Sequence, residues 1–367
     1  VIAGLHKGLQ GLIKLRNVTY VEGTGRLTSK NTVEVNGTSY LGKNIILATG
    51  SYARTLPGLD IDGERIITSD QGTHLDYVPK SVIVLGGGVI GCEFASVWKS
   101  FGSDVTIIEG LLHLVALEDE SSSKLLERAF RKRGIKFELG VRFKSHRADA
   151  KGVTVTLEDG REISADLLLV SVGRGPVTDG LGYQEAGITM DRGYITVDEN
   201  CRTNVPGIFA VGDIIPTLQL AHVGFQEGIL VAETIAGLNP RPINYDGVPR
   251  VTYSEPEVAS VGLSTKVAKE RGYDVVEIDY NLAGNGKAQI LKTAGSIKLV
   301  AAKNGPILGV HMVGSRVGEL LAEAQLIFNW EATADDVAPL IHAHPTLSEA
   351  MGEAHMALAG KALHSHG

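Results

Sequence analysis

A glycine-rich segment in the first third of the chain carries the most specific chemical signal. Gly86, Gly88 and Gly91 have the spacing GxGxxG, follow the apolar run 81–85 and open a helical pattern. In such a turn the first glycine allows a tight bend, the second lets backbone approach a pyrophosphate, and the third lets helix and strand pack closely. The helix N-terminus then presents free N–H groups to the phosphates. The segment therefore predicts a dinucleotide-binding turn.

An acidic residue at the end of the next apolar run, Glu109, lies 18 residues after Gly91. A carboxylate at this place accepts hydrogen bonds from ribose hydroxyls and repels a 2′-phosphate. Glu109 therefore favours NAD over NADP as the ligand. The alternative is a solvated acid at a strand end, which would have the same sequence pattern.

The segment His342-Ala-His-Pro345 has residues that could act as an acid or a base. His344 precedes Pro345, which we predict as the first residue of a helix, and Glu349 lies five residues after His344. A carboxylate near an imidazole fixes its tautomer and raises its basicity. A structural histidine is the alternative, because the chain has 11 histidines and several crowd this end. No convincing set of metal ligands accompanies them, so we predict no metal site.

A third segment, Phe209 to Asp213, runs from apolar residues through Gly212 to an acid. A glycine here would let a ligand lie against the backbone, and the carboxylate could bind polyol hydroxyls. The pattern equally fits an ordinary turn at the end of a strand.

The composition narrows the class of protein that carries these segments. The 367 residues are 43% hydrophobic, enough for two or three domains, and the net charge is −7. This charge, without a basic stripe, argues against a nucleic-acid partner. No apolar run has the roughly 18 to 20 residues that a membrane helix needs. The chain has only two cysteines, Cys92 and Cys201, which favours a reducing cytosol. They are 109 residues apart, which excludes a CxxC or CxxxxC pair.

The periodicity of apolar residues predicts the elements that position these segments. Residues 1–16 have helical spacing, and 18–21, 32–35 and 44–47 are predicted strands of an antiparallel meander with a hairpin turn at Asn36-Gly37. From residue 81 strands and helices alternate as in a doubly wound α/β domain, and beyond a Pro-rich linker the pattern indicates α+β. The later predictions are helices 89–101, 121–133, 218–236, 318–328 and 346–359 and strands 104–109, 136–139, 153–157, 167–172, 275–280, 297–302 and 307–313.

The order of the motifs along the chain carries a resemblance to a known family. The motifs are Gly86-Gly-Gly-Val-Ile-Gly-Cys-Glu93-Phe, Ser171-Val-Gly-Arg174, Thr203 through Asp213, Leu218-Gln-Leu-Ala-His222, and His342-Ala-His-Pro-Thr-Leu-Ser-Glu349. Over essentially all 367 residues the chain resembles the dihydrolipoamide dehydrogenases, a family of flavin disulfide reductases. The last two motifs are the specific ones, and they favour a catalytic role for His344.

The resemblance implies a division of the chain and a homodimer. Residues 1–55 would be a remnant of an FAD-binding Rossmann-like domain, 56–176 the doubly wound NAD-binding domain, 177–246 the return segment of the FAD domain, and 247–367 an α+β dimerisation domain. The enzyme would oxidise dihydrolipoamide with NAD⁺ through FAD and a redox disulfide. Its partners would be the lipoyl domains of 2-oxo acid dehydrogenase complexes, in the cytoplasm.

The resemblance also implies a role for each candidate site residue. His344 would take a thiol proton from dihydrolipoamide, in the active site of the other subunit, and Glu349 would orient it. The residues implied to line NAD are Gly86, Gly88, Gly91, Glu93, Glu109 and Gly173. Those implied to contact FAD are Thr49, Gly50, Ser51, Arg174, Asp213, Gln219, Leu220, Ala221 and His222.

The sequence departs from the family at its beginning. The family starts with its own GxGxxG segment for FAD and a CxxxxC disulfide; neither occurs here, and Cys92 and Cys201 do not match that pair. We therefore expect about a hundred residues of the family pattern to be missing and these 367 residues alone to be inactive. Three alternatives stay open: a glutathione-type reductase, which would have Arg near Glu109; a mercuric reductase, which would have another cysteine pair near the C-terminus; and a non-catalytic NAD-binding, dimerising module.

Overall fold

The computed structural model describes residues 1–364 and divides into two compact units, each built from two stretches of the chain. The first unit combines Val1–Tyr52 with Gly175–Ile243. The second combines Ala53–Arg174 with the chain from Asn244 onward. The strands β5 (Ser51–Ala53) and β14 (Arg174–Pro176) lie where the chain passes from one unit to the other.

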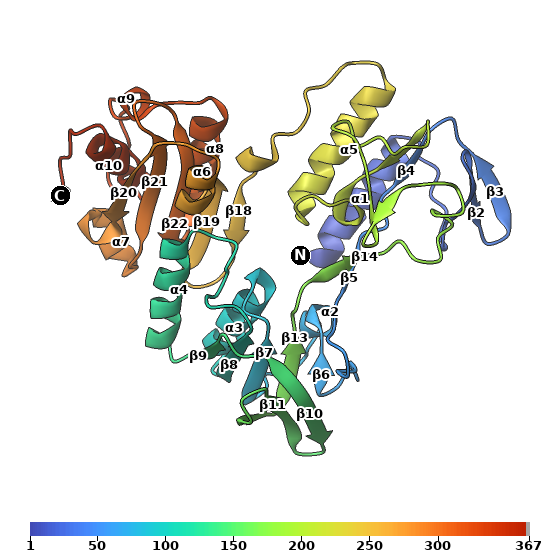
Figure 1. The fold of residues 1–367 in the computed structure, drawn as a ribbon, viewed down its shortest axis with the longest axis horizontal. Helices are drawn as coiled ribbons and strands as arrows, with labels where there is room; N and C mark the ends of the chain where they lie inside the picture. The colour runs from blue at the N-terminus through green and yellow to red at the C-terminus, as the bar shows by residue number, and fades with distance from the viewer. Residues whose placement is uncertain (365–367) are drawn as a thin grey trace. The chain divides into compact units, whose positions relative to one another are not determined.

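The first unit begins with helix α1 (Ile2–Leu15), as predicted, and an antiparallel three-stranded sheet (Figure 1). Its strands are β1 (Arg26–Ser29), β2 (Thr32–Val35) and β3 (Thr38–Leu41). Asn36 and Gly37 form the predicted hairpin turn with φ of +51° and +77°. The prediction of a strand at 18–21 is wrong, because these residues are exposed and pair with no neighbouring strand. Its β-branched and aromatic residues have no pleated surface to pack against.

The residues on both sides of Asp213, Val211 and Ile214, pack into the hydrophobic core of the first unit. Strand β4 (Ile45–Leu47) pairs in parallel with β17 (Ile208–Ala210), so it is not part of the meander. Helix α5 (Ala221–Ile235) packs Leu230 and Val231 into the same core as these strands. The remaining elements are β15 (Met190–Asp191), β16 (Tyr194–Ile195) and the 3-10 turn η1 (Gly212–Ile214).

The second unit contains a five-stranded parallel sheet in the order β6-β13-β7-β8-β9. Helices α3 and α4 pack against one face of this sheet, and an antiparallel sheet β10-β11-β12 packs against the other. The bounds are β6 (Ile66–Ile67), α2 (Ser69–Gly72), β7 (Ser81–Leu85), α3 (Val89–Ser100), β8 (Asp104–Glu109), α4 (Glu120–Lys132), β9 (Lys136–Leu139), β10 (Phe143–Asp149), β11 (Gly152–Leu157), β12 (Glu162–Ala165) and β13 (Leu167–Val170).

The central strand β7 is buried on both faces, which explains why it could be predicted from the sequence. Val82 and Val84 point into the core beneath α3 and α4, whereas Ile83 and Leu85 point into the core beneath β11. A strand covered on both faces needs apolar residues at every position, which is why its sequence is a continuous apolar run. The strand ends directly before Gly86, so its packing fixes where the glycine turn begins.

The rest of the second unit is an antiparallel sheet in the order β18-β19-β22-β21-β20 with helices packed on it, as the α+β pattern predicted (Figure 1). The strands are β18 (Arg250–Thr252), β19 (Glu257–Gly262), β20 (Val275–Asn281), β21 (Ser296–Ala302) and β22 (Ile307–Gly314). The helices are α6 (Thr265–Glu270), α7 (Gly286–Leu291), α8 (Leu321–Asn329), α9 (Ala334–Val337) and α10 (Glu349–Leu358), with 3-10 turns η2 (Tyr245–Gly247), η3 (Leu282–Gly284) and η4 (Val317–Leu320).

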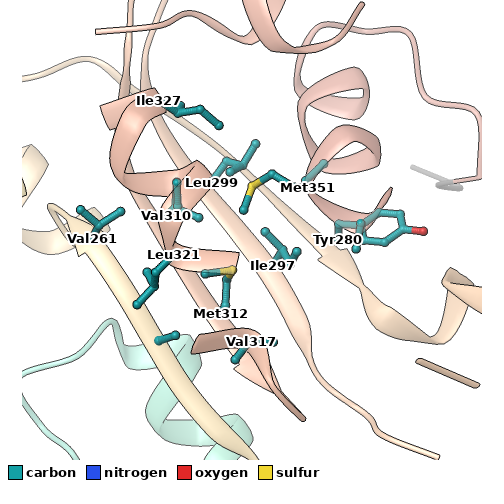
Figure 2. Close-up of a cluster of buried hydrophobic side chains, with 14 of the residues drawn as sticks. Val261, Tyr280, Ile297, Leu299, Val310, Met312, Val317, Leu321, Ile327 and Met351 are labelled. Carbon is teal, nitrogen blue, oxygen red and sulfur yellow. The ribbon is translucent and has the colours of Figure 1, made fainter. Parts of the chain in front are cut away.

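Helices α8 and α10 share one hydrophobic core with the face of the sheet that they cover. Figure 2 shows Leu321 of α8 and Met351 of α10 in the same cluster as Leu299 and Val310 of the strands. The prediction that Pro345 is the first helical residue is wrong, because α10 begins at Glu349. The residues before Glu349 form an irregular segment instead, and this segment carries His344.

Polar contacts join the parallel-sheet part of the second unit to its C-terminal sheet. Asp119 at the start of α4 accepts hydrogen bonds from Lys298 Nζ at 3.0 Å and from the Thr265 amide at 3.0 Å. Burial alone would raise the pKa of Asp119, but the hydrogen bonds from Ser121 and Lys298 outweigh it and lower that pKa. On the neighbouring side, Arg133 Nη1 donates to the Glu255 carbonyl at 2.7 Å. These contacts hold α4 on the C-terminal sheet.

Candidate functional site

The glycine turn after β7 has a separate structural reason for each of its three motif glycines. Gly86 has φ +109°, and a Cβ there would lie 2.3 Å from the Ser171 carbonyl oxygen. A Cβ on Gly91 would lie 1.9 Å from the Gly86 carbonyl oxygen. No atom lies within 4 Å of a Cβ built on Gly88. Gly86 and Gly91 are therefore required by close backbone packing, whereas Gly88 borders open space that a ligand can enter.

The N-terminus of α3 completes the geometry that a pyrophosphate needs. Gly88 is the N-cap residue, and no side chain caps the first turn of this 12-residue helix. The N–H groups of that turn and the positive end of the helix dipole therefore remain available to an anion. Together with the open space at Gly88, this arrangement fits the phosphates of NAD.

Glu109 is held beside the glycine turn by two backbone amides. Its Oε2 accepts the Gly87 N–H at 2.6 Å and its Oε1 accepts the Leu111 N–H at 2.7 Å. Each carboxylate oxygen has a second lone pair that can accept a ribose hydroxyl. Gly87 was not predicted as a site residue from the sequence, although its position as a fourth glycine within the motif could have indicated it. A Cβ on Gly87 would lie 3.1 Å from Glu109 Cβ and 2.6 Å from Leu114 Cδ2, so glycine is the residue that fits this close approach without movement of either side chain.

Glu93, predicted to line NAD, lies on α3 in the wall of a cavity of about 720 Å³. The lining is largely aromatic and aliphatic, including Phe94, Trp98 and Tyr253. Burial raises the pKa of the Glu93 carboxyl, and the Tyr253 amide, which donates to its Oε1 at 2.8 Å, partly opposes this rise. Gly173, the other predicted contact outside the turn, has φ +109° and no atom within 4 Å of a built Cβ.

Four of the residues predicted to contact FAD, Gly50, Ser51, Asp213 and Gln219, lie in the first unit, two of them hydrogen-bonded to each other through Ser51 and Asp213. The Ser51 hydroxyl donates to Asp213 Oδ2, and Gln219 Nε2 donates to the Asp213 carbonyl at 3.4 Å. Gly50 and Gly212 have φ of +75° and +72° with open space at a built Cβ. The first unit therefore presents an acid bonded to a hydroxyl, and two glycines with open space beside their backbone, which fits a polyol and phosphate ligand.

The other predicted FAD contacts lie at three places. Thr49 donates its hydroxyl to the Val177 carbonyl at 2.5 Å. Leu220 is the N-cap of α5, and Ala221 and His222 are its first residues, without a side-chain cap. Arg174 belongs to the second unit, where its guanidinium lies 4.0 Å from Asp70.

Glu227 on α5 is a functional candidate that sequence reasoning missed. It is fully buried, and its Oε2 accepts the Gly212 N–H at 2.6 Å while its Oε1 accepts the Thr217 hydroxyl at 2.8 Å. A buried carboxylate is costly unless such donors satisfy it. Glu227 therefore fixes the turn that carries Asp213. The signal in the sequence was weak, because α5 has a second acid, Glu233, among its mostly apolar and small residues.

His344 and Glu349 form the pair that the sequence predicted. His344 Nδ1 lies 2.8 Å from Glu349 Oε1, and the Thr346 amide donates to Glu349 Oε2 at 2.8 Å. The Thr346 amide, together with the His344 imidazole, holds the pKa of Glu349 below its ordinary value. An ionised Glu349 makes Nδ1 the protonated nitrogen of a neutral imidazole, which leaves Nε2 with a free lone pair. The side chain of His344 is 77% exposed, which contradicts a role as a core histidine.

The two cysteines are not placed for redox chemistry. Both are buried and unpaired in the structure. Burial raises the pKa of the Cys92 thiol and raises that of Cys201 to about 12, so neither is a thiolate near neutral pH. Among residues 1–364, no group of three or more His, Cys, Asp or Glu side chains could hold a metal ion.

Comparison with known proteins places the chain in a family. Residues 1–228 match the description "Pyridine nucleotide-disulphide oxidoreductase", and residues 248–355 match the dimerisation domain of the same family. The chain therefore belongs to the pyridine nucleotide-disulphide oxidoreductases. Within them it is a flavin disulfide reductase of the dihydrolipoamide dehydrogenase type, with FAD and NAD as its cofactors, which confirms the resemblance, the fold class and the cofactors predicted from the sequence.

Individual relatives support this placement over nearly the whole chain. A mitochondrial dihydrolipoyl dehydrogenase of Pisum sativum is 39% identical over 99% of this chain and 75% of its own length. A dihydrolipoyl dehydrogenase of Bacillus subtilis (strain 168) is 39% identical over 99% of this chain and 81% of its own length. The crystal structure of LpdA from Mycobacterium tuberculosis superposes with a TM-score of 0.90 at 28% identity, covering 97% of this chain and 81% of that one.

The dimerisation-domain match supports a homodimer. In the part of the chain that the structure describes, we find no helix with the length and apolar character needed to cross a membrane.

Proposed function

We propose that His344 is the base that accepts a thiol proton when this enzyme oxidises dihydrolipoamide with NAD⁺, and that Glu349 orients it. The 2.8 Å contact between His344 Nδ1 and Glu349 Oε1 is the observation that carries the proposal. It leaves Nε2 of an exposed imidazole free to accept a proton, and the nearby carboxylate stabilises the imidazolium that results.

The residues around the two cofactor sites bind and select rather than move protons. When bound, FAD would supply an electron-pair acceptor that links the dithiol to NAD⁺. Asp213 and the backbone at Gly50 and Gly212 would hold the flavin nucleotide. The turn at Gly86, Gly88 and Gly91 would hold the pyrophosphate of NAD, with Glu109 on the ribose.

The partners follow from the same chemistry. His344 is exposed, so a dithiol carried on another protein can approach its imidazole. Such a dithiol is carried by a lipoyl domain of a 2-oxo acid dehydrogenase complex. In the proposed homodimer, the C-terminal domain would bring His344 to the active site of the other subunit. The cytoplasmic location favoured by the cysteine content stays a prediction.

A panel of substrates tests the proposed function on the natural flavin-containing protein. We expect turnover of dihydrolipoamide with NAD⁺, and none of glutathione disulfide or Hg²⁺ with NADPH. Preferential reduction of glutathione disulfide or Hg²⁺ would replace the proposal with the corresponding reductase. Binding of NADH without any thiol turnover would favour the non-catalytic module.

Replacing Glu109 with Arg should move cofactor preference from NAD⁺ toward NADP⁺. The carboxylate would lie against a 2′-phosphate, and like charges at short range cost a few kcal/mol when partly desolvated. The ratio of kcat/KM for the two cofactors measures the shift. Glu109→Gln is the matched control, since it removes the charge but keeps an acceptor for one of the Gly87 and Leu111 amides. Equal kcat/KM for both cofactors in the unaltered enzyme would contradict the assignment.

A further inference from the structure

His342 makes a second histidine–carboxylate contact two residues before His344. Its Nε2 lies 2.8 Å from Glu323 Oε1 on α8. The side chain of His342 is only 13% exposed, against 77% for His344. From residue 339 to 345, His342 is the only residue that is not exposed. It is therefore the side chain that attaches this irregular segment to the body of the domain.

The ring of His342 also packs against the helix that carries Glu349. A Cβ built on Gly352 of α10 would lie 2.6 Å from His342 Nδ1 and 2.9 Å from its Cε1. Gly352 follows Glu349 by three residues, so the two lie on neighbouring positions of one helical face. Glycine at 352 thus makes room for the imidazole, and His342 touches both α8 and α10.

The segment is fixed independently on the other side of His344. The Thr346 hydroxyl donates to the Ala343 carbonyl at 2.6 Å, and Asn285 Nδ2 donates to the Thr346 carbonyl at 3.1 Å. Before His344, by contrast, Ile341 is 99% exposed, and the contacts of His342 are the corresponding anchor. His344 therefore lies between two attachment points, one at His342 and one at Thr346.

We propose that His342, held by Glu323 and seated against Gly352, is a positioning residue that keeps His344 at hydrogen-bonding distance from Glu349. This inference rests on the proposed function, because it assigns His342 a role through His344. The titratable groups that face His342 are Glu323, Glu349 and His355. Burial lowers the pKa of the His355 imidazole. His342 does not itself contact substrate in this assignment.

A double-mutant cycle in the holoenzyme tests the role. His342→Ala should lower kcat for dihydrolipoamide oxidation by about 10- to 100-fold, the usual effect of a misplaced catalytic group. NADH should still reduce the flavin at its normal rate, because that half-reaction needs no base at the thiol. His342→Gln should recover part of the loss, since its amide can donate to Glu323. In a His344→Gln background, His342→Ala should add less than twofold, because coupled residues are not additive.

His364→Ala is the matched control, because His364 Nδ1 also lies 2.8 Å from a carboxylate of α10, that of Glu353. It should leave both half-reactions unchanged. Full activity of His342→Ala, or a loss that adds in full to that of His344→Gln, would overturn the positioning role. A joint fall of both half-reactions and of the melting temperature would show a merely structural role instead. If His344→Gln alone had no effect, the proposed function would fail, which is a different result from either of these.

Discussion

Replacing His344 with Gln should lower dihydrolipoamide oxidation by roughly 10² to 10⁴, the usual contribution of a positioned general base. Gln has no nitrogen that can accept the thiol proton, whereas His344 Nε2 is free because Nδ1 is held by Glu349. Reduction of the flavin by NADH should be unchanged, since no thiol proton moves in that half-reaction. Stopped-flow measurement of the two half-reactions checks the prediction.

Two features of the site sharpen this test. Since His344 is 77% exposed, its replacement should leave the melting temperature unchanged, and an equal loss of both half-reactions would contradict its role as a base. Glu349→Gln should cost less activity than His344→Gln, because the imidazole remains. The pKa of Glu349 lies below its ordinary value of 4.5, so its charge is present above pH 4.5 and is lost only as the pH falls through the lowered pKa.

Replacing Gly91 with Ala should disrupt the turn itself, whereas Gly88→Ala should disrupt only ligand binding. The new Cβ at 91 would lie 1.9 Å from a backbone oxygen, so α3 must move away from β7. We expect a loss of stability of about 3 kcal/mol, the upper end of the cost of overpacking. At Gly88 no atom lies within 4 Å of the new Cβ, and its φ of −72° suits alanine.

The two alanine variants separate packing from binding in one experiment. Thermal unfolding should show a lower melting temperature for Gly91→Ala and a nearly unchanged one for Gly88→Ala. Calorimetric titration with NADH should show weakened binding for both, because the Cβ at 88 enters the space where backbone approaches the pyrophosphate. Normal NADH affinity in Gly88→Ala would contradict the dinucleotide assignment of this turn.

The sequence alone determined the elements whose pattern is local and whose burial is uniform. Strands β7, β8 and β9 lie where the sequence predicted them. The signal is clearest for β7, because a strand buried on both faces is a continuous apolar run. The spacing of Gly86, Gly88 and Gly91 identified the turn because the motif lies within six residues, although the carbonyl that Gly86 approaches belongs to the distant Ser171. The order of motifs was enough to predict the family and its cofactors.

The tertiary structure decided whatever depends on residues far apart in the chain. The β-like stretch 18–21 forms no strand because no partner strand lies beside it, and β4 pairs with β17, more than 150 residues later. Glu227 could not be predicted as a site residue from the sequence, because its partner, the Gly212 amide 2.6 Å away, lies outside its own helix. The contact of His342 with Glu323 was equally hidden, because a hydrogen bond between an irregular segment and a helix leaves no periodicity in either sequence. Residue spacing therefore predicted the glycine turn and the pairing of His344 with Glu349. Only long-range packing showed that Glu227 and Glu323 fix the segments that carry Asp213 and His344.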